Sequence, residues 1–306
     1  MTSTVHVTDV AKDYGGLKAV CGVSFELRQG ELVALIGHNG AGKTTLMKLM
    51  LGLIRPTSGS IEVLGDNPAA GQFAGRRQLG YLPENVSFDA ALTGRETLAF
   101  YARLKRETVA SALKLLDAVG LGDASRRRVG TYSKGMRQRL GLAQALIGHP
   151  RVLLLDEPTT GLDPELRQTF YEIIQRLAAE GTTVLLSSHA LTELEERAGR
   201  VIIMNRGVKV ADGSIEGLRN IARLPTKIRL KIAGLGPGEL PSWLPTGAPC
   251  RRLDGHLVEI EAEPDQKIEL LHSATASGRA VEDLDVLPPT LDELYAHFLR
   301  QAERTP

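Results

Sequence analysis

The sequence lacks most features that mark secreted, membrane-spanning or metal-binding proteins. It has only two cysteines in 306 residues, and Cys21 and Cys250 are too far apart for a metal-binding motif. Two isolated thiols are typical of a reducing compartment, so we expect both to be structural. Residues 1–7 have no signal-peptide core, and the continuous apolar runs are only as long as strands. We therefore expect no direct insertion into a bilayer.

The chain also lacks a charge excess of either sign. It carries 37 Lys and Arg residues against 36 Asp and Glu residues, a net charge of +1. A near-neutral chain has no general electrostatic attraction for nucleic acid, so we expect no nucleic-acid partner. There are no internal repeats and no low-complexity tracts, and the length is sufficient for two domains.

The strongest pattern present is a glycine-rich stretch between an apolar run at residues 31–36 and a helical pattern at residues 44–50. It fits the phosphate-loop motif G-x-x-x-x-G-K-[ST]. Its glycines allow backbone N–H groups to surround a polyphosphate, and the following helix adds the positive end of its dipole. A plain glycine turn is the alternative. The motif and its context together predict a nucleotide-phosphate site at Gly37, His38, Asn39, Gly40, Ala41, Gly42, Lys43, Thr44 and Thr45.

Two carboxylates follow a second apolar run at residues 152–155. A run without alternation is typical of a strand buried in a parallel sheet, and ligands collect at the carboxyl ends of such strands. In phosphate-loop enzymes an acid in the place of Asp156 helps to hold Mg²⁺ together with the hydroxyl of Thr44, while Lys43 reaches the β- and γ-phosphates. The adjacent Glu157 is positioned to take a proton from an attacking water. Two solvated acids at the start of a loop are the alternative.

Other residues predict ligand contacts less specifically. His189 ends another buried strand at the same sheet edge, where it is either structural or in contact with a γ-phosphate. Tyr14 precedes two glycines, so it is either a turn residue or a platform that stacks on a nucleotide base. Ser133, followed by Lys134 and Gly135, begins a helix as an N-cap or as a second anion site. Asp163 is the expected N-cap of the next long helix.

From about residue 222 the pattern changes. Two alternating apolar segments and two helical segments predict a small α+β appendage without a catalytic motif. We therefore predict an α/β domain over residues 1–221, with a helical subdomain at about 86–148, and a second domain over residues 222–306.

The ordered set of motifs resembles the ATP-binding-cassette (ABC) ATPases over residues 5–212. Residues 133–138 resemble the signature motif of these ATPases, and residues 153–158 resemble their motif that contains the Mg²⁺-binding acid and the general base. Residues 161–163 resemble the loop that crosses their dimer interface, and His189 matches their switch histidine. The resemblance implies a P-loop cassette with a RecA-like core, an N-terminal antiparallel β-subdomain and an α-helical subdomain.

The resemblance also implies an activity and partners. It implies hydrolysis of ATP with Mg²⁺, catalysed by Glu157 and His189, in a sandwich of two copies. Each nucleotide would contact Tyr14 and the phosphate loop of one copy, and Ser133, Lys134, Gly135 and Asp163 at the interface. It further implies a separate integral-membrane permease, which would hold the chain at the cytoplasmic face of the cell membrane.

Two residues depart from the family pattern. Lys134 replaces the first of two glycines that usually follow the signature serine. Glu84 replaces the glutamine that usually senses the membrane partner and contacts Mg²⁺, and we expect the carboxylate to take that role.

A narrower resemblance concerns the transported cargo. Residues 37–40, 79–88 and 132–146 are similar to the Nos-type ATPases, which belong to a transporter implicated in maturing the copper centres of nitrous-oxide reductase. Two alternatives remain: the ATPase of another exporter for a drug, lipid or glycan, and a soluble ABC protein that does not transport. The chain has no metal-ligand motif of its own, so any copper or sulfur cargo would be handled by another subunit.

Overall fold

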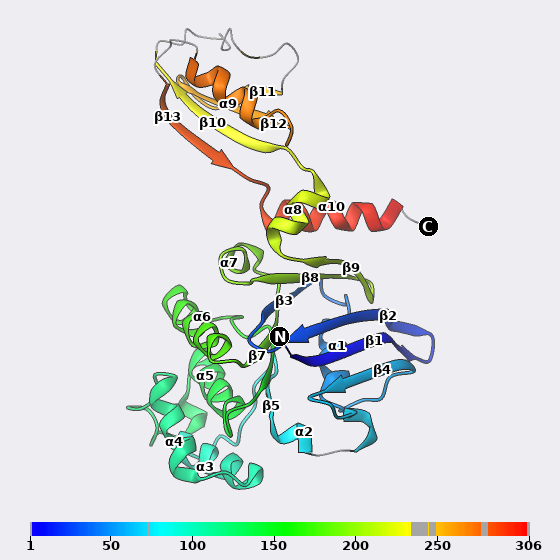
Figure 1. Ribbon diagram of the computed structural model, residues 1–306. Coiled ribbons are helices and arrows are strands. Elements are labelled where there is room, and N and C mark those ends of the chain that lie inside the picture. Colours follow the sequence, from blue (N-terminus) through cyan, green and yellow to red (C-terminus); the bar gives the residue numbers. More distant parts are fainter. Residues whose placement is uncertain (1, 72–73, 234–243, 245–248, 277–280, 305–306) are drawn as a thin grey trace. The chain divides into compact units, whose positions relative to one another are not determined.

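The computed structural model describes residues 2–71, 74–233, 244, 249–276 and 281–304, and these form two compact units (Figure 1). The first unit is Met1–Ser214 and the second is Ile215–Pro306. The division therefore falls between residues 214 and 215, whereas we expected it between 221 and 222. The reason is that helix α8 (Ile215–Ala222) packs against helix α10 (Leu291–Arg304) of the second unit.

A six-stranded sheet forms the centre of the first unit, in the order β5-β6-β7-β3-β8-β9. The first five strands are parallel, and β9 is antiparallel to β8. All residues of β6 and β7 are buried, as their continuous apolar runs predict. The strands are β3 (Leu32–Ile36), β5 (Leu79–Leu82), β6 (Val152–Asp156), β7 (Thr183–Ser188), β8 (Arg200–Asn205) and β9 (Val208–Gly213).

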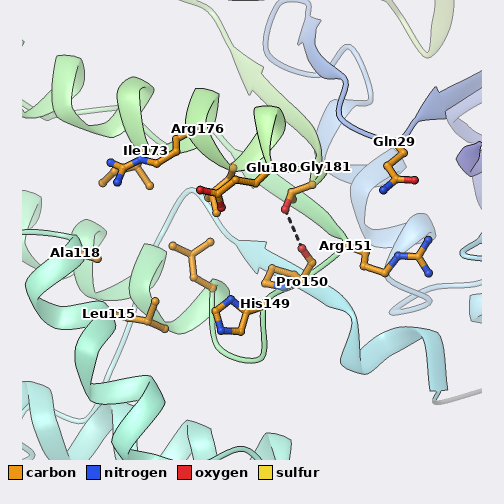
Figure 2. A pocket seen from close by; sticks show the side chains of 13 residues that line it. Gln29, Leu115, Ala118, His149, Pro150, Arg151, Ile173, Arg176, Glu180 and Gly181 are labelled. Atoms are coloured by element: carbon orange, nitrogen blue, oxygen red, sulfur yellow. Dashed lines mark hydrogen bonds between the residues drawn. The ribbon is translucent and has the colours of Figure 1, made fainter. Parts of the chain in front are cut away.

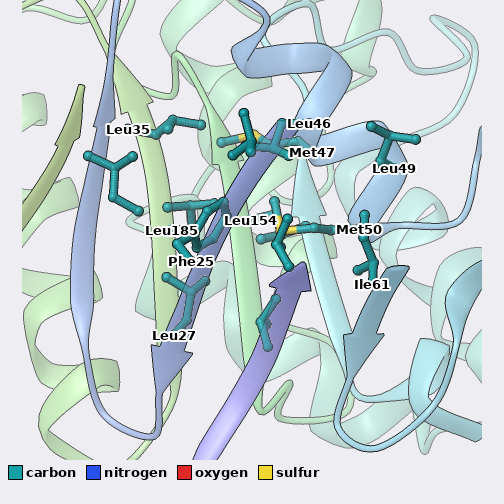
Figure 3. Packing of buried hydrophobic residues seen from close by; sticks show 14 of the residues in the cluster. Phe25, Leu27, Leu35, Leu46, Met47, Leu49, Met50, Ile61, Leu154 and Leu185 are labelled. Carbon is teal, nitrogen blue, oxygen red and sulfur yellow. The ribbon is translucent and has the colours of Figure 1, made fainter. Parts of the chain in front are cut away.

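A three-stranded antiparallel sheet precedes this core in the chain. It consists of β1 (Ser3–Tyr14), β2 (Leu17–Arg28) and β4 (Ser58–Val63), with β1 in the middle. Helix α1 (Lys43–Met50) contacts strands of both sheets. Figure 3 shows how Leu46, Met47 and Met50 of this helix pack among side chains from both, so that one hydrophobic core fixes the start of α1.

Helices fill the rest of the first unit. The caps predicted at Ser133 and Asp163 are confirmed, because both side chains accept hydrogen bonds from backbone N–H groups. Thr93 and Glu96 form a capping box at the start of α3 (Gly94–Lys105). The helices are α2 (Ala74–Arg77), α3 (Gly94–Lys105), α4 (Val109–Ala118), α5 (Lys134–Ala145), α6 (Pro164–Ala179) and α7 (Leu191–Glu195), with short 3-10 turns η1 (Pro68–Ala70) and η2 (Val129–Thr131). The predicted α/β architecture, with a parallel core, an antiparallel β-subdomain and a helical subdomain, is confirmed.

The second unit is built on a four-stranded antiparallel sheet in the order β11-β12-β10-β13. Its core comes from alternate residues of β10 and β12 together with Leu270 and Ala274 of helix α9 (Lys267–Ala276). The unit is therefore α+β, as predicted. Its strands are β10 (Thr226–Ile232), β11 (Cys250–Arg252), β12 (Leu257–Ala262) and β13 (Val281–Leu287).

The register of the parallel strands determines where the predicted site residues lie. Ile36 at the end of β3 pairs with Ser188 of β7, and Asp156 of β6 pairs with Ser187. The segments that follow β3, β6 and β7 therefore leave the sheet at the same edge. Within the described residues, no helix is long and apolar enough to cross a membrane.

Candidate functional site

The phosphate-loop motif forms a tight connection between β3 and α1. Gly42 has a φ of +101°, and a Cβ at this position would approach the carbonyl oxygen of Ala19 to 2.4 Å, so the connection requires glycine. The side chain of Lys43 is buried, and its Nζ donates to the carbonyl oxygens of Gly37 (2.5 Å) and His38 (3.4 Å). The loop thus brings a buried ammonium group to the start of a helix, a combination that suits phosphate oxygens.

One serine hydroxyl links the two acids at the end of β6. Ser187 Oγ donates to Asp156 Oδ1 at 2.7 Å and accepts from the backbone N–H of Glu157 at 2.9 Å. All three residues are buried. Ser187 was missed from the sequence because only the pairing of β6 with β7 brings it there. Its contacts fix Asp156 and the backbone that carries Glu157 at the same sheet edge as the phosphate loop.

Glu157 lies between the phosphate-loop lysine and His189. Its backbone has a φ of +48°, a left-handed conformation that is unusual for a residue with a side chain. Its Oε2 lies 2.7 Å from His189 Nδ1, and since a carboxylate only accepts, Nδ1 carries the proton in this contact. Its Oε1 lies 3.7 Å from Lys43 Nζ and is buried without a hydrogen-bond partner among the described residues. That oxygen is free to accept a proton from a water.

Lys43 and Glu157 line a cavity of about 500 Å³ together with Tyr14 and Glu84, whereas His189 is outside its wall. Tyr14 is half exposed, and Lys12 Nζ lies 5.0 Å from its ring centroid. Thr44 and Asp156 line the cavity as well, so its wall contains two threonine hydroxyls, three carboxylates and the ammonium groups of Lys18 and Lys43. The sequence-predicted residues in its wall are Tyr14, His38, Asn39, Gly40, Ala41, Gly42, Lys43, Thr44, Thr45, Glu84, Asp156 and Glu157.

Three further wall residues were not singled out from the sequence, namely Leu17, Lys18 and Ala19. They follow Tyr14 across the turn between β1 and β2. The feature of the sequence that could have pointed to them is the pair of glycines in that turn. Tyr81 lies close to the acids: burial, and then the charges of Asp156 and Glu84, raises its pKa to about 12. Tyr81 therefore stays neutral at physiological pH and adds no charge near this cavity.

Gly37 and His189 are outside the wall but contact Lys43 and Glu157, whereas Ser133, Lys134, Gly135 and Asp163 form a second group that does not line the cavity. Ser133 caps α5, and Asp163 caps α6. Where a Cβ on Gly135 would lie, the side chains of Leu162 and Leu166 are 3.3 and 3.4 Å away, so the start of α5 packs against the loop before α6. Lys134 also lies on this loop, because its Nζ would be 2.8 Å from a Cβ on Gly161. The signature stretch and residues 161–163 thus form one surface.

Arg167 connects that loop to the segment after His189. Its Nε donates to the carbonyl oxygen of Leu162 at 2.9 Å, and its Nη1 forms an ion pair with Glu193 of α7. The second carboxylate oxygen of Glu193 is buried with no hydrogen-bond partner among the described residues. One guanidinium therefore fixes the loop before α6 and the helix α7, which begins just after His189, at the same time.

We expect Arg167→Ala to lower kcat for ATP hydrolysis about tenfold while leaving KM for ATP unchanged, because Arg167 does not line the cavity. Arg167→Lys should recover only part of the rate, since an ammonium group cannot serve both partners in the same fork geometry. Gln168→Ala, on the neighbouring position of α6, is the matched control. Steady-state kinetics of the three variants checks this; a change in KM with unchanged kcat would contradict it.

The comparisons with known proteins agree with this geometry. The family described as "ABC transporter" matches residues 20–160. The chain is 34% identical over 305 residues to the daunorubicin resistance ATP-binding protein DrrA3 of Streptomyces coeruleorubidus, covering 97% of this chain and 96% of that protein. It is 33% identical over 298 residues to the Nod factor export ATP-binding protein I of Rhizobium meliloti (strain 1021), covering 96% and 87%.

A solved structure gives the same result for the fold. The structure titled "Structure of ATP binding subunit of ABC transporter" has a TM-score of 0.67 and 32% identity, and the match covers 71% of this chain and 92% of that one. The similarity to the two relatives extends over 97% and 96% of this chain. The chain therefore belongs to the ABC transporter family, as an ATP-binding subunit of the ATPase type whose members couple ATP hydrolysis to transport.

Proposed function

We propose that this chain hydrolyses ATP for an exporter whose membrane-spanning part is a separate permease. The observation that carries the proposal is the cavity in which Lys43, Asp156 and Glu157 come together, in a chain related over its length to export ATP-binding proteins. Attachment to the permease would hold the chain at the cytoplasmic face of the membrane. A soluble, non-transport role remains the alternative, and co-sedimentation with membranes that contain the permease separates the two.

The side chains in the cavity fit Mg²⁺ and a nucleotide. Thr44, Asp156 and Glu84 supply only oxygen ligands, which Mg²⁺ prefers, and the buried Lys43 supplies a cation for the phosphates. Mg²⁺ would neutralise charge on the β- and γ-phosphates. In this proposal Tyr14 stacks on the base, and Lys43 exchanges its contacts with the Gly37 and His38 carbonyls for the phosphate oxygens.

The proposed reaction is an in-line attack of water on the γ-phosphorus. A water oxygen forms the new bond to phosphorus, the bond to the β-phosphate oxygen breaks, and ADP leaves. Glu157 takes the proton of the water on Oε1, its buried oxygen without a partner. His189 holds the other oxygen, Oε2, and so orients the carboxylate as well as contacting the γ-phosphate.

Members of this family typically work as dimers, and we propose that a second copy completes the site. Ser133, Lys134, Gly135 and Asp163 lie on a surface that does not line the cavity of their own chain. The start of α5 would present its N–H groups to the γ-phosphate bound by the partner. Lys134 would add a positive charge there, in place of the usual glycine.

For the cargo, the full-length relatives favour export of a drug, lipid or glycan. One is named for daunorubicin resistance and the other for Nod factor export, whereas the Nos-type assignment rests on the motif similarities in residues 37–40, 79–88 and 132–146. A drug-resistance operon beside the gene would support the export proposal, and a gene for a copper-binding lipoprotein would oppose it.

A deletion strain tests the cargo directly. For an exporter, loss of the gene should raise the accumulation of a fluorescent drug severalfold and leave nitrous-oxide reduction unchanged. Complementation with the Glu157→Gln variant should not restore export, which ties the effect to hydrolysis. Normal drug accumulation with a lost copper centre in nitrous-oxide reductase would reverse the assignment.

We expect Tyr14→Ala to raise KM for ATP about tenfold with little change in kcat, because stacking on a base is worth ~1–3 kcal/mol and Tyr14 has no proposed role in proton transfer. Tyr14→Phe keeps the ring and is the matched control. Steady-state kinetics with ATP and with tripolyphosphate checks the role. If Tyr14→Ala weakens binding of tripolyphosphate, which has no base, as much as binding of ATP, the stacking role is wrong.

A further inference from the structure

Figure 2 shows a second cavity. It lies at the sheet edge opposite the phosphate loop. Arg151 and Thr182, which precede β6 and β7, are in its wall, whereas the predicted catalytic acids follow β6. Its volume is about 490 Å³, within the range of pockets that bind drug-sized ligands. Among the residues that the structure describes, none lines both this cavity and the one that contains Lys43.

The inner wall of this cavity is apolar. Leu115 comes from α4, Leu146 from the end of α5, and Ile173 and Leu177 from α6, with Pro150 beneath them. Leu146, Pro150 and Ile173 are buried. A wall of aliphatic side chains from three helices favours an apolar ligand body over a free sugar or a small inorganic ion.

The rim is positively charged. Arg151 and Arg176 are exposed and lie on opposite sides of the view in Figure 2. Neither forms an ion pair or side-chain hydrogen bond within the described part of the chain. Glu180 is the one carboxylate in the described wall, so two guanidinium groups face one acid. Unpaired arginines beside an apolar wall suit a ligand that ends in a carboxylate or sulfonate.

We propose that this cavity binds an amphipathic organic anion and that binding alters the rate of ATP hydrolysis. Two helices connect the cavity with the proposed nucleotide contacts. Ser133 precedes α5 and Leu146 follows it, while Asp163 precedes α6 and Leu177 lies in its last turn. These helices of 12 and 16 residues are about 18 and 24 Å long, so a ligand that shifts their far ends also shifts Ser133 and Asp163.

Two fluorescent probes that differ in one group test the binding. 8-Anilinonaphthalene-1-sulfonate carries the anion, and N-phenyl-1-naphthylamine is its uncharged counterpart. In the presence of a non-hydrolysable ATP analogue, which keeps the nucleotide cavity filled, we expect one sulfonate probe per chain. The uncharged probe should bind about tenfold more weakly, the scale of one charge-assisted contact.

Three substitutions locate the probe. Ala118→Trp fills the cavity from an exposed position of α4 and should weaken the sulfonate probe at least about tenfold. Arg176→Gln should weaken the sulfonate probe alone and leave the uncharged probe unchanged. Lys114→Gln, exposed on α4 and outside the wall, is the matched control. Circular dichroism and thermal unfolding confirm that each variant is folded.

The outcomes separate the parts of the proposal. Unchanged sulfonate binding in folded Ala118→Trp would overturn the site, and equal binding of the two probes to the wild type would overturn the preference for an anion. With saturating sulfonate probe, the wild-type ATPase rate should change at least about twofold, and Ala118→Trp should not respond. Binding without any change in rate would overturn the coupling to hydrolysis.

Discussion

Replacing Glu157 with glutamine is expected to lower ATP hydrolysis roughly 100-fold or more while ATP still binds. Glutamine has nearly the same shape, but its amide cannot take a proton from water. Glu157 Oε1 is buried, has no hydrogen-bond partner within the described chain, and lies 3.7 Å from Lys43 Nζ. Because the substitution leaves the phosphate loop intact, the loss should fall on kcat rather than on nucleotide affinity.

The measurement is phosphate release at saturating Mg-ATP, together with equilibrium binding of a fluorescent ATP analogue. Glu165→Gln is the matched control, because Glu165 is exposed in the first turn of α6 and does not line the cavity. A Glu157→Gln protein with wild-type turnover would refute the role of this residue as general base. Loss of ATP binding in the same protein would show a role in holding the nucleotide instead.

Two separately inactive variants are expected to recover activity when they are mixed. Lys43→Ala removes the cation of the phosphate loop, and Ser133→Arg obstructs the start of α5. Ser133 does not line the cavity that contains Lys43, so in the proposed arrangement a complete site needs Ser133 from a second chain. A mixed dimer contains one intact site, made from Lys43 of one chain and Ser133 of the other, which encloses the γ-phosphate between two helix starts.

If chains exchange at random, half of the dimers in an equal mixture are mixed, and each mixed dimer has one of its two sites intact. The mixture should therefore recover about a quarter of wild-type activity. Activity should rise faster than linearly with protein concentration where dimers are scarce, with the permease supplied if hydrolysis needs it. Lys43→Ala mixed with Lys43→Ala/Ser133→Arg is the control, because it has no intact pair. Proven mixed dimers without activity would rule out the composite site.

The local motifs could be predicted from the sequence because each depends on neighbouring residues. The phosphate loop could be recognised from its glycine spacing, because those glycines determine the local backbone conformation. The caps at Ser133 and Asp163 each involve two residues that are three positions apart. Continuous apolar runs identified β6 and β7 as buried parallel strands, and the rule for their carboxyl ends then brought Asp156 and His189 to one edge.

Contacts between distant segments could not be predicted in the same way. Ser187 is 31 positions from Asp156, and Glu193 is 26 positions from Arg167, and no local pattern specifies either pair. Strand β13 was missed because it contains three acids in seven residues, which weakens its alternating pattern. Residues 215–221 were assigned to the first domain because no local sequence pattern shows that α8 packs against α10.

The most direct test of the proposed function is whether ATP joins two copies of the chain. Glu157→Gln should bind Mg-ATP without consuming it, so sedimentation velocity should show a monomer without nucleotide and a dimer with Mg-ATP, containing two ATP per dimer. The double variant Lys43→Ala/Glu157→Gln should stay monomeric under both conditions. A Glu157→Gln chain that retains one ATP and sediments as a monomer at every concentration would contradict a site completed by a second copy.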